Sequence, residues 1–210
     1  MRSKLLILKF IAFCFSLPFT ERMDFVSWWH RNFESPAPHF IKMRILDSAM
    51  NVDIWIETGT FMGRTTNFLR KKSSLVISIE PSEKLAANAT QLFEPYSNVR
   101  IVEGLSENAL DKILCEVRSK RGHIAFWLDG HFSGGTTHLG PIETPILKEL
   151  EIITQNLQYF DEVSVFIDDF RCFAKRETDY PSTDVLSSWA RENGMSWSVE
   201  HDIFIARIGA

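Results

Sequence analysis

Residues 52–63 read Val52-Asp53-Ile54-Trp55-Ile56-Glu57-Thr58-Gly59-Thr60-Phe61-Met62-Gly63, an apolar strand that breaks into a glycine turn. A second apolar strand follows at residues 75–80 and ends in Glu80. A strand, a glycine turn, a helix and a second strand with a terminal carboxylate form the layout of a nucleoside-binding α/β half. In that layout the backbone approaches the ligand at the turn, and the carboxylate accepts hydrogen bonds from ribose hydroxyls. Because Phe61 stands where dinucleotide enzymes carry their second glycine, the turn favours a nucleoside ligand without a pyrophosphate.

Strands and helices continue to alternate along the rest of the chain. Apolar runs predict further strands at 99–103, 124–129 and 163–168, and we expect Ser106 and Thr144 to cap helices, the second with Pro145 at its first position. Two runs at 195–200 and 203–208 lie so close together that they must form an antiparallel hairpin. The pattern predicts an α/β fold: a Rossmann-like three-layer sandwich whose seven-stranded, mostly parallel sheet ends in an antiparallel C-terminal hairpin.

The composition narrows the class of protein. The chain has 210 residues, which suits one well-buried domain, and a net charge of -4. Its basic residues are scattered and form no stripe, so we expect no nucleic-acid partner. The cysteines Cys14, Cys115 and Cys172 match neither a disulfide framework nor a zinc pattern, so a reducing, cytoplasmic location is expected.

The N-terminal part differs from the rest. We interpret residues 1–50 as an apolar and helical extension and residues 51–210 as the α/β body. Residues 1–20 begin with basic charges and continue as an apolar run too short for a typical membrane span. They could be a retained docking helix that contacts a membrane surface or a second copy of the chain, or a signal or anchor segment. Trp28 and Trp29 could pack against the body or form part of a substrate lid.

Three strand ends carry motifs that suggest a family. They are Glu57-Thr58-Gly59 with Gly63, then Leu128-Asp129-Gly130, then Ile167-Asp168-Asp169-Phe170. With these motifs in this order, residues 51–210 resemble the class I S-adenosylmethionine-dependent methyltransferases, and in particular the macrocin and sugar O-methyltransferase subset. The resemblance implies that S-adenosylmethionine is the cofactor.

The same resemblance implies roles for individual residues. Glu57, Gly59 and Gly63 would surround the methionine part of the cofactor, with Thr58 and Thr60 in the same turn and their amides toward the ligand. Glu80 would hold the ribose hydroxyls, and Gly104, Leu105 and Ser106 would border the adenine. Asp129 would lie at the base of the active site.

The strand-end acids also suggest a mechanism of activation. A hydroxyl acceptor needs a base, a metal ion or both, because its pKa is too high for deprotonation near neutral pH. Asp129, Asp168 and Asp169 should converge at the carboxyl edge of neighbouring strands, and three oxygen ligands suit Mg²⁺, so we hypothesise a magnesium site there. Asp168 and Asp169 could instead pair with Arg171 and Lys175, and Asp129 could serve only the cofactor's ammonium. His131 is a candidate general base; it could also be a fourth metal ligand or only a hydrogen-bonding residue of the loop.

The function that these features favour is S-adenosylmethionine-dependent methylation, with O-methylation of a small-molecule or sugar-containing substrate preferred and Mg²⁺ as a candidate aid. One alternative is a nicotinamide-dependent oxidoreductase, against which the missing middle glycine and the closing hairpin count. Another is a non-catalytic methyltransferase-fold protein that binds a ligand in glycan or natural-product assembly. The residues leave the acceptor atom open between oxygen, nitrogen and carbon.

Overall fold

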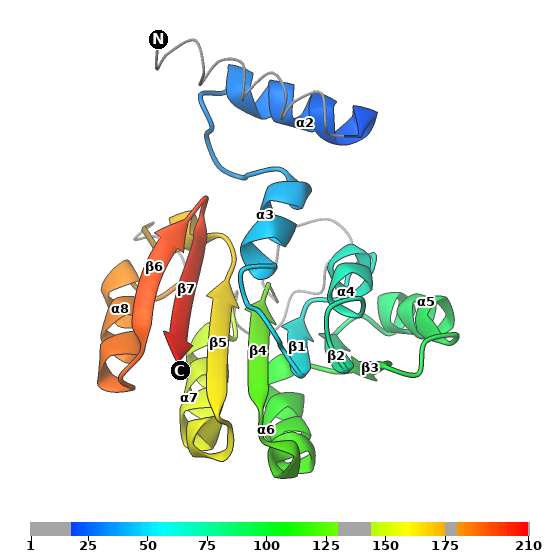
Figure 1. Ribbon diagram of the computed structural model, residues 1–210, viewed down its shortest axis with the longest axis vertical. Coiled ribbons are helices and arrows are strands. Elements are labelled where there is room, and N and C mark those ends of the chain that lie inside the picture. The colour runs from blue at the N-terminus through cyan, green and yellow to red at the C-terminus, as the bar shows by residue number, and fades with distance from the viewer. Residues whose placement is uncertain (1–17, 130–143, 175–179, 210) are drawn as a thin grey trace.

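The computed structural model describes residues 18–129, 144–174 and 180–209. Its centre is a seven-stranded sheet in the order β3-β2-β1-β4-β5-β7-β6 (Figure 1). The strands are β1 (Ile54–Thr58), β2 (Leu75–Glu80), β3 (Val99–Glu103), β4 (His123–Leu128), β5 (Glu162–Ile167), β6 (Ser196–Glu200) and β7 (Ile203–Ile208). Strands β1 to β5 pair in parallel, and β7 runs antiparallel to both β5 and β6. The predicted fold is therefore confirmed, including the reversed C-terminal hairpin.

Helices connect the strands as the alternating pattern predicts. They are α2 (Phe19–His30), α3 (His39–Leu46), α4 (Arg64–Leu69), α5 (Glu83–Phe93), α6 (Ser106–Val117), α7 (Ile146–Asn156) and α8 (Thr183–Glu192), with short 3-10 turns at Arg118–Lys120, Leu157–Tyr159 and Phe170–Ala174. Two of the capping predictions need correction. Ser106 is the first helical residue rather than the cap, because the extended residue Leu105 precedes it. Pro145 takes the cap position of α7, while Thr144 Oγ1 accepts a hydrogen bond from the amide of Ile146 at 3.4 Å.

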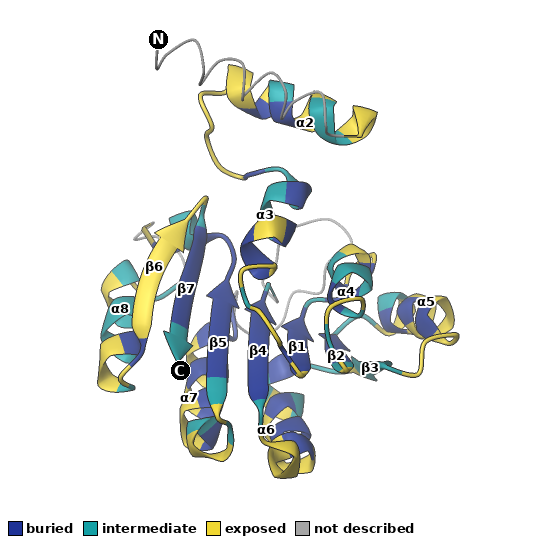
Figure 2. Ribbon diagram, in the orientation of Figure 1, coloured by how far each residue is buried: buried dark blue, intermediate teal, exposed yellow. Residues whose placement is uncertain are grey.

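Both faces of the sheet are buried, as expected for parallel strands joined by crossover helices. One face carries Ile56, Ile77, Phe126 and Val165 and packs against apolar residues of α6, α7 and α8. The other face packs against α3 and α4 (Figure 1); its residues include Trp55, Val76, Trp127, Phe166 and Ile205. Figure 2 shows the central strands buried along their length and the edge strand β6 exposed. The alternation of neighbouring side chains between two apolar layers explains why these strands read as nearly continuous apolar runs.

The two helices of the predicted N-terminal extension, α2 and α3, pack in different places. Helix α3 lies within the core, because Met43 and Leu46 pack against the sheet. Helix α2 packs through a separate cluster that includes Phe25, Trp28 and Phe40. Trp28 is 3% exposed and meets the ring of His201, in the β6–β7 turn, edge-on with centroids 5.2 Å apart. Trp28 thus packs against the body, as the first of the two alternatives predicts.

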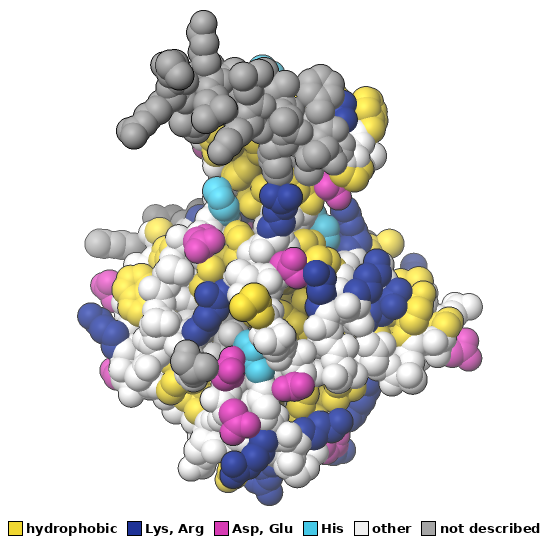
Figure 3. All heavy atoms as spheres, viewed as in Figure 1, with side chains coloured by type: hydrophobic (Ala, Val, Ile, Leu, Met, Phe, Trp, Pro, Cys, Tyr) yellow, Lys and Arg dark blue, Asp and Glu magenta, His cyan; other side chains and the backbone are white. Residues whose placement is uncertain are grey.

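The remaining N-terminal features concern the surface. Trp29 is 49% exposed, unlike Trp28. In the described ranges, every helix falls short of the length or apolar character that crossing a bilayer requires. The apolar run before residue 18 lies outside the described residues, so the membrane-surface and homodimer contacts proposed for residues 1–20 stay predictions. On the face shown in Figure 3, basic and acidic side chains are interspersed.

Candidate functional site

The turn after β1 depends on glycine for its shape. Gly59 and Gly63 have φ angles of 90° and 70°, and the intervening Phe61 has a φ of 46°. A Cβ at Gly63 would lie 2.7 Å from Cε2 of Phe93, so this position excludes a side chain on steric as well as conformational grounds. The amide of Gly59 donates to the carbonyl of Ile79 at 2.9 Å, which ties the turn to β2. The result is a tight loop whose backbone lies open to a ligand at the carboxyl edge of the sheet.

Glu80 lies at the end of β2, directly beside this turn. Its Oε2 accepts a hydrogen bond from the amide of Phe61 at 2.8 Å, and its Oε1 accepts one from the amide of Ser82 at 3.0 Å. A carboxylate oxygen can accept two hydrogen bonds, so each oxygen keeps one acceptor position. Two remaining acceptor positions on one carboxylate match the two hydroxyls of a ribose. This geometry agrees with the role that the sequence suggests for Glu80.

Glu57 lies in β1, directly before the turn, and is fully buried. Its Oε2 accepts hydrogen bonds from Thr66 Oγ1 at 2.5 Å and Ser78 Oγ at 2.6 Å, and Thr60 in turn bonds Ser78 at 2.6 Å. Its Oε1 has no hydrogen-bond partner among the described residues. Burial raises the pKa of Glu57 to about 7, with a smaller contribution from the charge of Glu80, although the two hydroxyls oppose the shift. A buried carboxylate with an unpartnered oxygen would be stabilised by a cation such as the ammonium of a bound amino acid.

The three residues expected to border the adenine lie at the same edge. The amide of Gly104 donates to the carbonyl of Glu80 at 3.0 Å, which joins the end of β3 to the end of β2. Gly104 has a φ of 143°, and no atom of the described part of the chain lies within 4 Å of the position that a Cβ would take. Leu105 is extended, and Ser106 begins α6 and is buried. These three residues therefore lie next to Glu80 at the carboxyl edge of the sheet, and their contact with an adenine stays a prediction.

The ends of β4 and β5 bring Asp129 and Asp168 to neighbouring positions. Leu128 pairs with Ile167 in the sheet, and the amide of Asp168 donates to the carbonyl of Leu128 at 3.1 Å. The amide of Asp129 donates to the carbonyl of Thr58 at 3.1 Å, which places Asp129 beside the glycine turn. The predicted convergence of these strand ends is thus present.

Two of the carboxylates at these strand ends, Asp168 and Asp169, form ion pairs with basic side chains. The side chain of Asp168 is 1% exposed, and its Oδ2 forms an ion pair with Lys42 of α3. Asp169 pairs with Arg171 at 2.6 Å, and Arg171 also pairs with Asp202. Burial lowers the pKa of Lys42, but the charges of Asp168 and Asp129 outweigh that effect and raise it, so the ammonium persists at neutral pH.

This arrangement does not fit the hypothesised magnesium site. Within residues 18–129, 144–174 and 180–209, no group of three or more His, Cys, Asp or Glu side chains is arranged to hold a metal ion. The pairing of Asp169 with Arg171 is the alternative that the sequence leaves open; Lys175, its other suggested partner, lies outside the described residues. The magnesium site therefore remains a hypothesis without support from these contacts. His131 also lies outside the described residues, so its role as a base stays a prediction.

Lys42 is the residue that sequence reasoning missed. Nothing local connects it to Asp168, which lies 126 residues further along the chain. Its only signal is its place in the short helical pattern that begins at His39, one turn earlier. His39 also responds to this neighbourhood: burial, then the charges of Arg64 and Lys42, lower its pKa to about 4.

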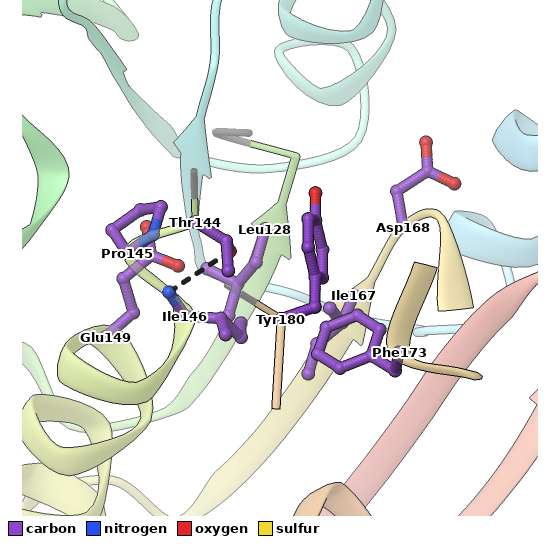
Figure 4. A pocket seen from close by; sticks show the side chains of 9 residues that line it. All are labelled: Leu128, Thr144, Pro145, Ile146, Glu149, Ile167, Asp168, Phe173 and Tyr180. Atoms are coloured by element: carbon purple, nitrogen blue, oxygen red, sulfur yellow. Dashed lines mark hydrogen bonds between the residues drawn. The ribbon is translucent and has the colours of Figure 1, made fainter. Parts of the chain in front are cut away.

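A small cavity of about 10 Å³ lies below the ends of β4 and β5. Its lining includes Leu128, Thr144, Ile167, Phe173 and Tyr180 (Figure 4). The ring of Tyr180 meets that of Phe173 edge-on, with centroids 5.1 Å apart. Asp168 also lines this cavity, which has room for about one water molecule and is therefore too small for a substrate.

Comparisons with known proteins agree with the fold. The chain matches no protein-family model and no curated protein. A structure from Staphylococcus aureus assigned as a caffeoyl-CoA O-methyltransferase is 15% identical, with a TM-score of 0.59 and coverage of 100% of both chains. A structure from Streptococcus mutans assigned as a methyltransferase, in complex with SAH, is 13% identical, with a TM-score of 0.53 over 83% of this chain and 98% of that chain. At these identities the likeness shows a Rossmann-like methyltransferase fold.

Proposed function

We propose that this protein is an S-adenosylmethionine-dependent methyltransferase that transfers a methyl group to a hydroxyl of a small-molecule or sugar-containing substrate. The observation that carries the proposal is the pair of glutamates around the glycine turn. Among the described residues, Glu80 keeps two acceptor positions beside the turn, and Glu57 has a buried oxygen without a hydrogen-bond partner. Both occur at the carboxyl edge of a mostly parallel sheet that ends in an antiparallel hairpin, where open α/β sheets bind ligands.

Different residues would bind different parts of the cofactor. Glu80 would accept hydrogen bonds from the ribose hydroxyls, and residues 104–106 would border the adenine. Glu57 would face the ammonium of the methionine part, whose charge would offset the cost of its burial. The bound cofactor supplies a methyl group on a sulfonium, and its transfer depends mainly on position and on exclusion of water.

The second part of the proposal concerns the residues that would bind the methyl acceptor. Asp129 lies beside the turn and would orient an acceptor at the end of β4. His131, two residues later, remains the candidate base for a hydroxyl. A small-molecule or glycan acceptor agrees with the scattered basic residues, and a cytoplasmic location agrees with the cysteine pattern.

The proposal can be tested by isothermal titration with S-adenosylhomocysteine. We expect micromolar binding to the wild type and binding at least tenfold weaker, about 1.4 kcal/mol, for Glu80→Gln, because the substitution replaces one charged acceptor oxygen with an amide nitrogen. Glu103→Gln is the matched control: Glu103 ends the neighbouring strand, pairs in register with Glu80 and is exposed. The Glu103→Gln variant should bind S-adenosylhomocysteine as tightly as the wild type does.

Two results would count against the proposal. Absence of binding to the folded wild type would remove the cofactor assignment and favour a non-catalytic relative of the fold. Binding of NADH in place of S-adenosylhomocysteine would favour the oxidoreductase alternative.

A further inference from the structure

The position of Lys42 follows from the way α3 packs. Met43 and Leu46 insert into the apolar cluster on the face of the sheet that contains Trp55 and Trp127. This anchoring holds the preceding turn of α3 over the carboxyl ends of the strands. The side chain of Lys42 is 16% exposed there, and its ammonium pairs with the buried carboxylate of Asp168. A helix outside the predicted α/β body thus supplies a cation to the centre of the predicted acceptor region.

Both carboxylate oxygens of Asp168 already have a partner, and one of these partners is a cation. Its Oδ2 binds the ammonium of Lys42, and its Oδ1 accepts the amide of Asp169 at 2.9 Å. Mg²⁺ would need direct carboxylate oxygens at about 2.0–2.1 Å in an octahedral arrangement. A divalent ion at that position would have to displace the ammonium or approach a fixed positive charge at close range, which is strongly unfavourable in a buried environment.

The neighbouring acid shows the same arrangement. Asp169 Oδ1 pairs with Arg171 at 2.6 Å, and Arg171 in turn pairs with Asp202 of the β6–β7 turn. Two of the three acids predicted to hold Mg²⁺ are therefore matched by cations from the chain itself. The ammonium of Lys42 also acts electrostatically on Asp129, the third acid.

We propose that Lys42 is a built-in cation that takes the place of a divalent metal at the ends of β4 and β5, so that methyl transfer by this protein is independent of metal ions. The inference rests on the proposed function, because it concerns the acceptor side of that site. A hydroxylated acceptor that enters beside Asp168 would meet an ammonium with N–H donors rather than a Lewis acid. Lys42 is then a positioning residue, which neutralises the strand-end carboxylates and fixes their geometry.

The test measures metal binding directly, with Mn²⁺ as the probe and electron paramagnetic resonance as the readout. The proteins are the wild type, Lys42→Met, and Lys148→Met as a control that removes an exposed lysine on α7. We expect the wild type and the control to bind Mn²⁺ no more tightly than the millimolar range. Lys42→Met should bind it at least tenfold more tightly, because the carboxylates lose their internal cation.

Several outcomes would overturn the proposal. These are wild-type binding of Mn²⁺ in the micromolar range, loss of turnover when the wild type is treated with EDTA, and no gain of Mn²⁺ affinity in Lys42→Met. Circular dichroism checks that the variant is folded, and Lys42→Gln replaces it in the same test if Met at this position prevents folding. Titration of the same proteins with S-adenosylhomocysteine separates the two proposals, since failure of cofactor binding refutes the proposed function while the Mn²⁺ result still reports on Lys42.

Discussion

The stability of the Glu57→Gln variant relative to the wild type should rise as the pH rises. Glu57 is fully buried, and burial raises its pKa from the ordinary 4.5 to about 7. Between these two values the folded protein holds a proton that the unfolded chain has released. The free energy of unfolding of the wild type therefore falls as pH rises from about 4.5 to 7 and is constant above that range. Glutamine cannot ionise and escapes this loss.

The magnitude follows from the size of the shift. Each pKa unit corresponds to about 1.4 kcal/mol, so the complete effect is about 3 kcal/mol. At pH 5 a small part of it, about 1 kcal/mol, is already present, because the unfolded carboxyl is then mostly ionised. The difference in unfolding free energy between Glu57→Gln and the wild type should thus grow by about 2–3 kcal/mol from pH 5 to pH 8. Any cost of fitting the amide beside Thr66 and Ser78 is the same at both pH values and cancels.

Urea unfolding followed by tryptophan fluorescence at pH 5 and pH 8 measures this difference. His39, whose lowered pKa gives stability that is lost as pH falls through the acid range, is present in both proteins, so its contribution also cancels. Glu103→Gln removes an exposed carboxyl and should track the wild type within about 0.5 kcal/mol at both pH values. A stability difference for Glu57→Gln that stays constant between pH 5 and pH 8 would refute the reasoning, as would one that shrinks.

The remaining predictions concern the turn and the N-terminal helix. Gly63→Ala should lower the free energy of unfolding, measured by thermal denaturation, by about 2–4 kcal/mol, because it combines a left-handed backbone with a clash against Phe93. Gly194→Ala is the control: Gly194 has a φ of 68°, no described atom lies within 4 Å of its Cβ position, and the substitution should cost only about 1 kcal/mol. Equal costs for the two variants would show that the clash with Phe93 contributes nothing. Trp28→Ala should cost about 3–5 kcal/mol and expose the segment before α3 to limited proteolysis, whereas Trp29→Ala should change stability by less than about 1 kcal/mol; similar digestion of the two variants would contradict the packing of α2 on the body.

Local patterns in the sequence predict most of the secondary structure. The strands expected at 75–80 and 99–103 coincide with β2 and β3, and the C-terminal hairpin differs from the expected one by a single residue. These elements depend on apolar runs and on nearby turn residues, which act over a few positions. The prediction that Ser106 caps α6 is wrong, because several residues near a helix start can take the cap position, and the extended backbone of Leu105 places the cap there.

Part of the candidate site can also be predicted from local sequence patterns. The glycine turn, Glu57 and Glu80 belong to one strand-turn-helix-strand unit of about 30 residues, so their proximity could be read from the sequence. The strand order of a parallel sheet also predicts that Asp129 and Asp168 approach each other.

The identity of the charges that meet at that edge depends on the tertiary structure. The sequence alone suggests that three acids bind a metal ion. In the folded protein, however, Lys42 pairs with Asp168, which is 126 residues away along the chain. The tertiary structure also determines the complete burial of Glu57 and hence its raised pKa. Both depend on where α3 and α4 come to rest on the sheet, and that placement results from the combined packing of many apolar side chains rather than from any local motif.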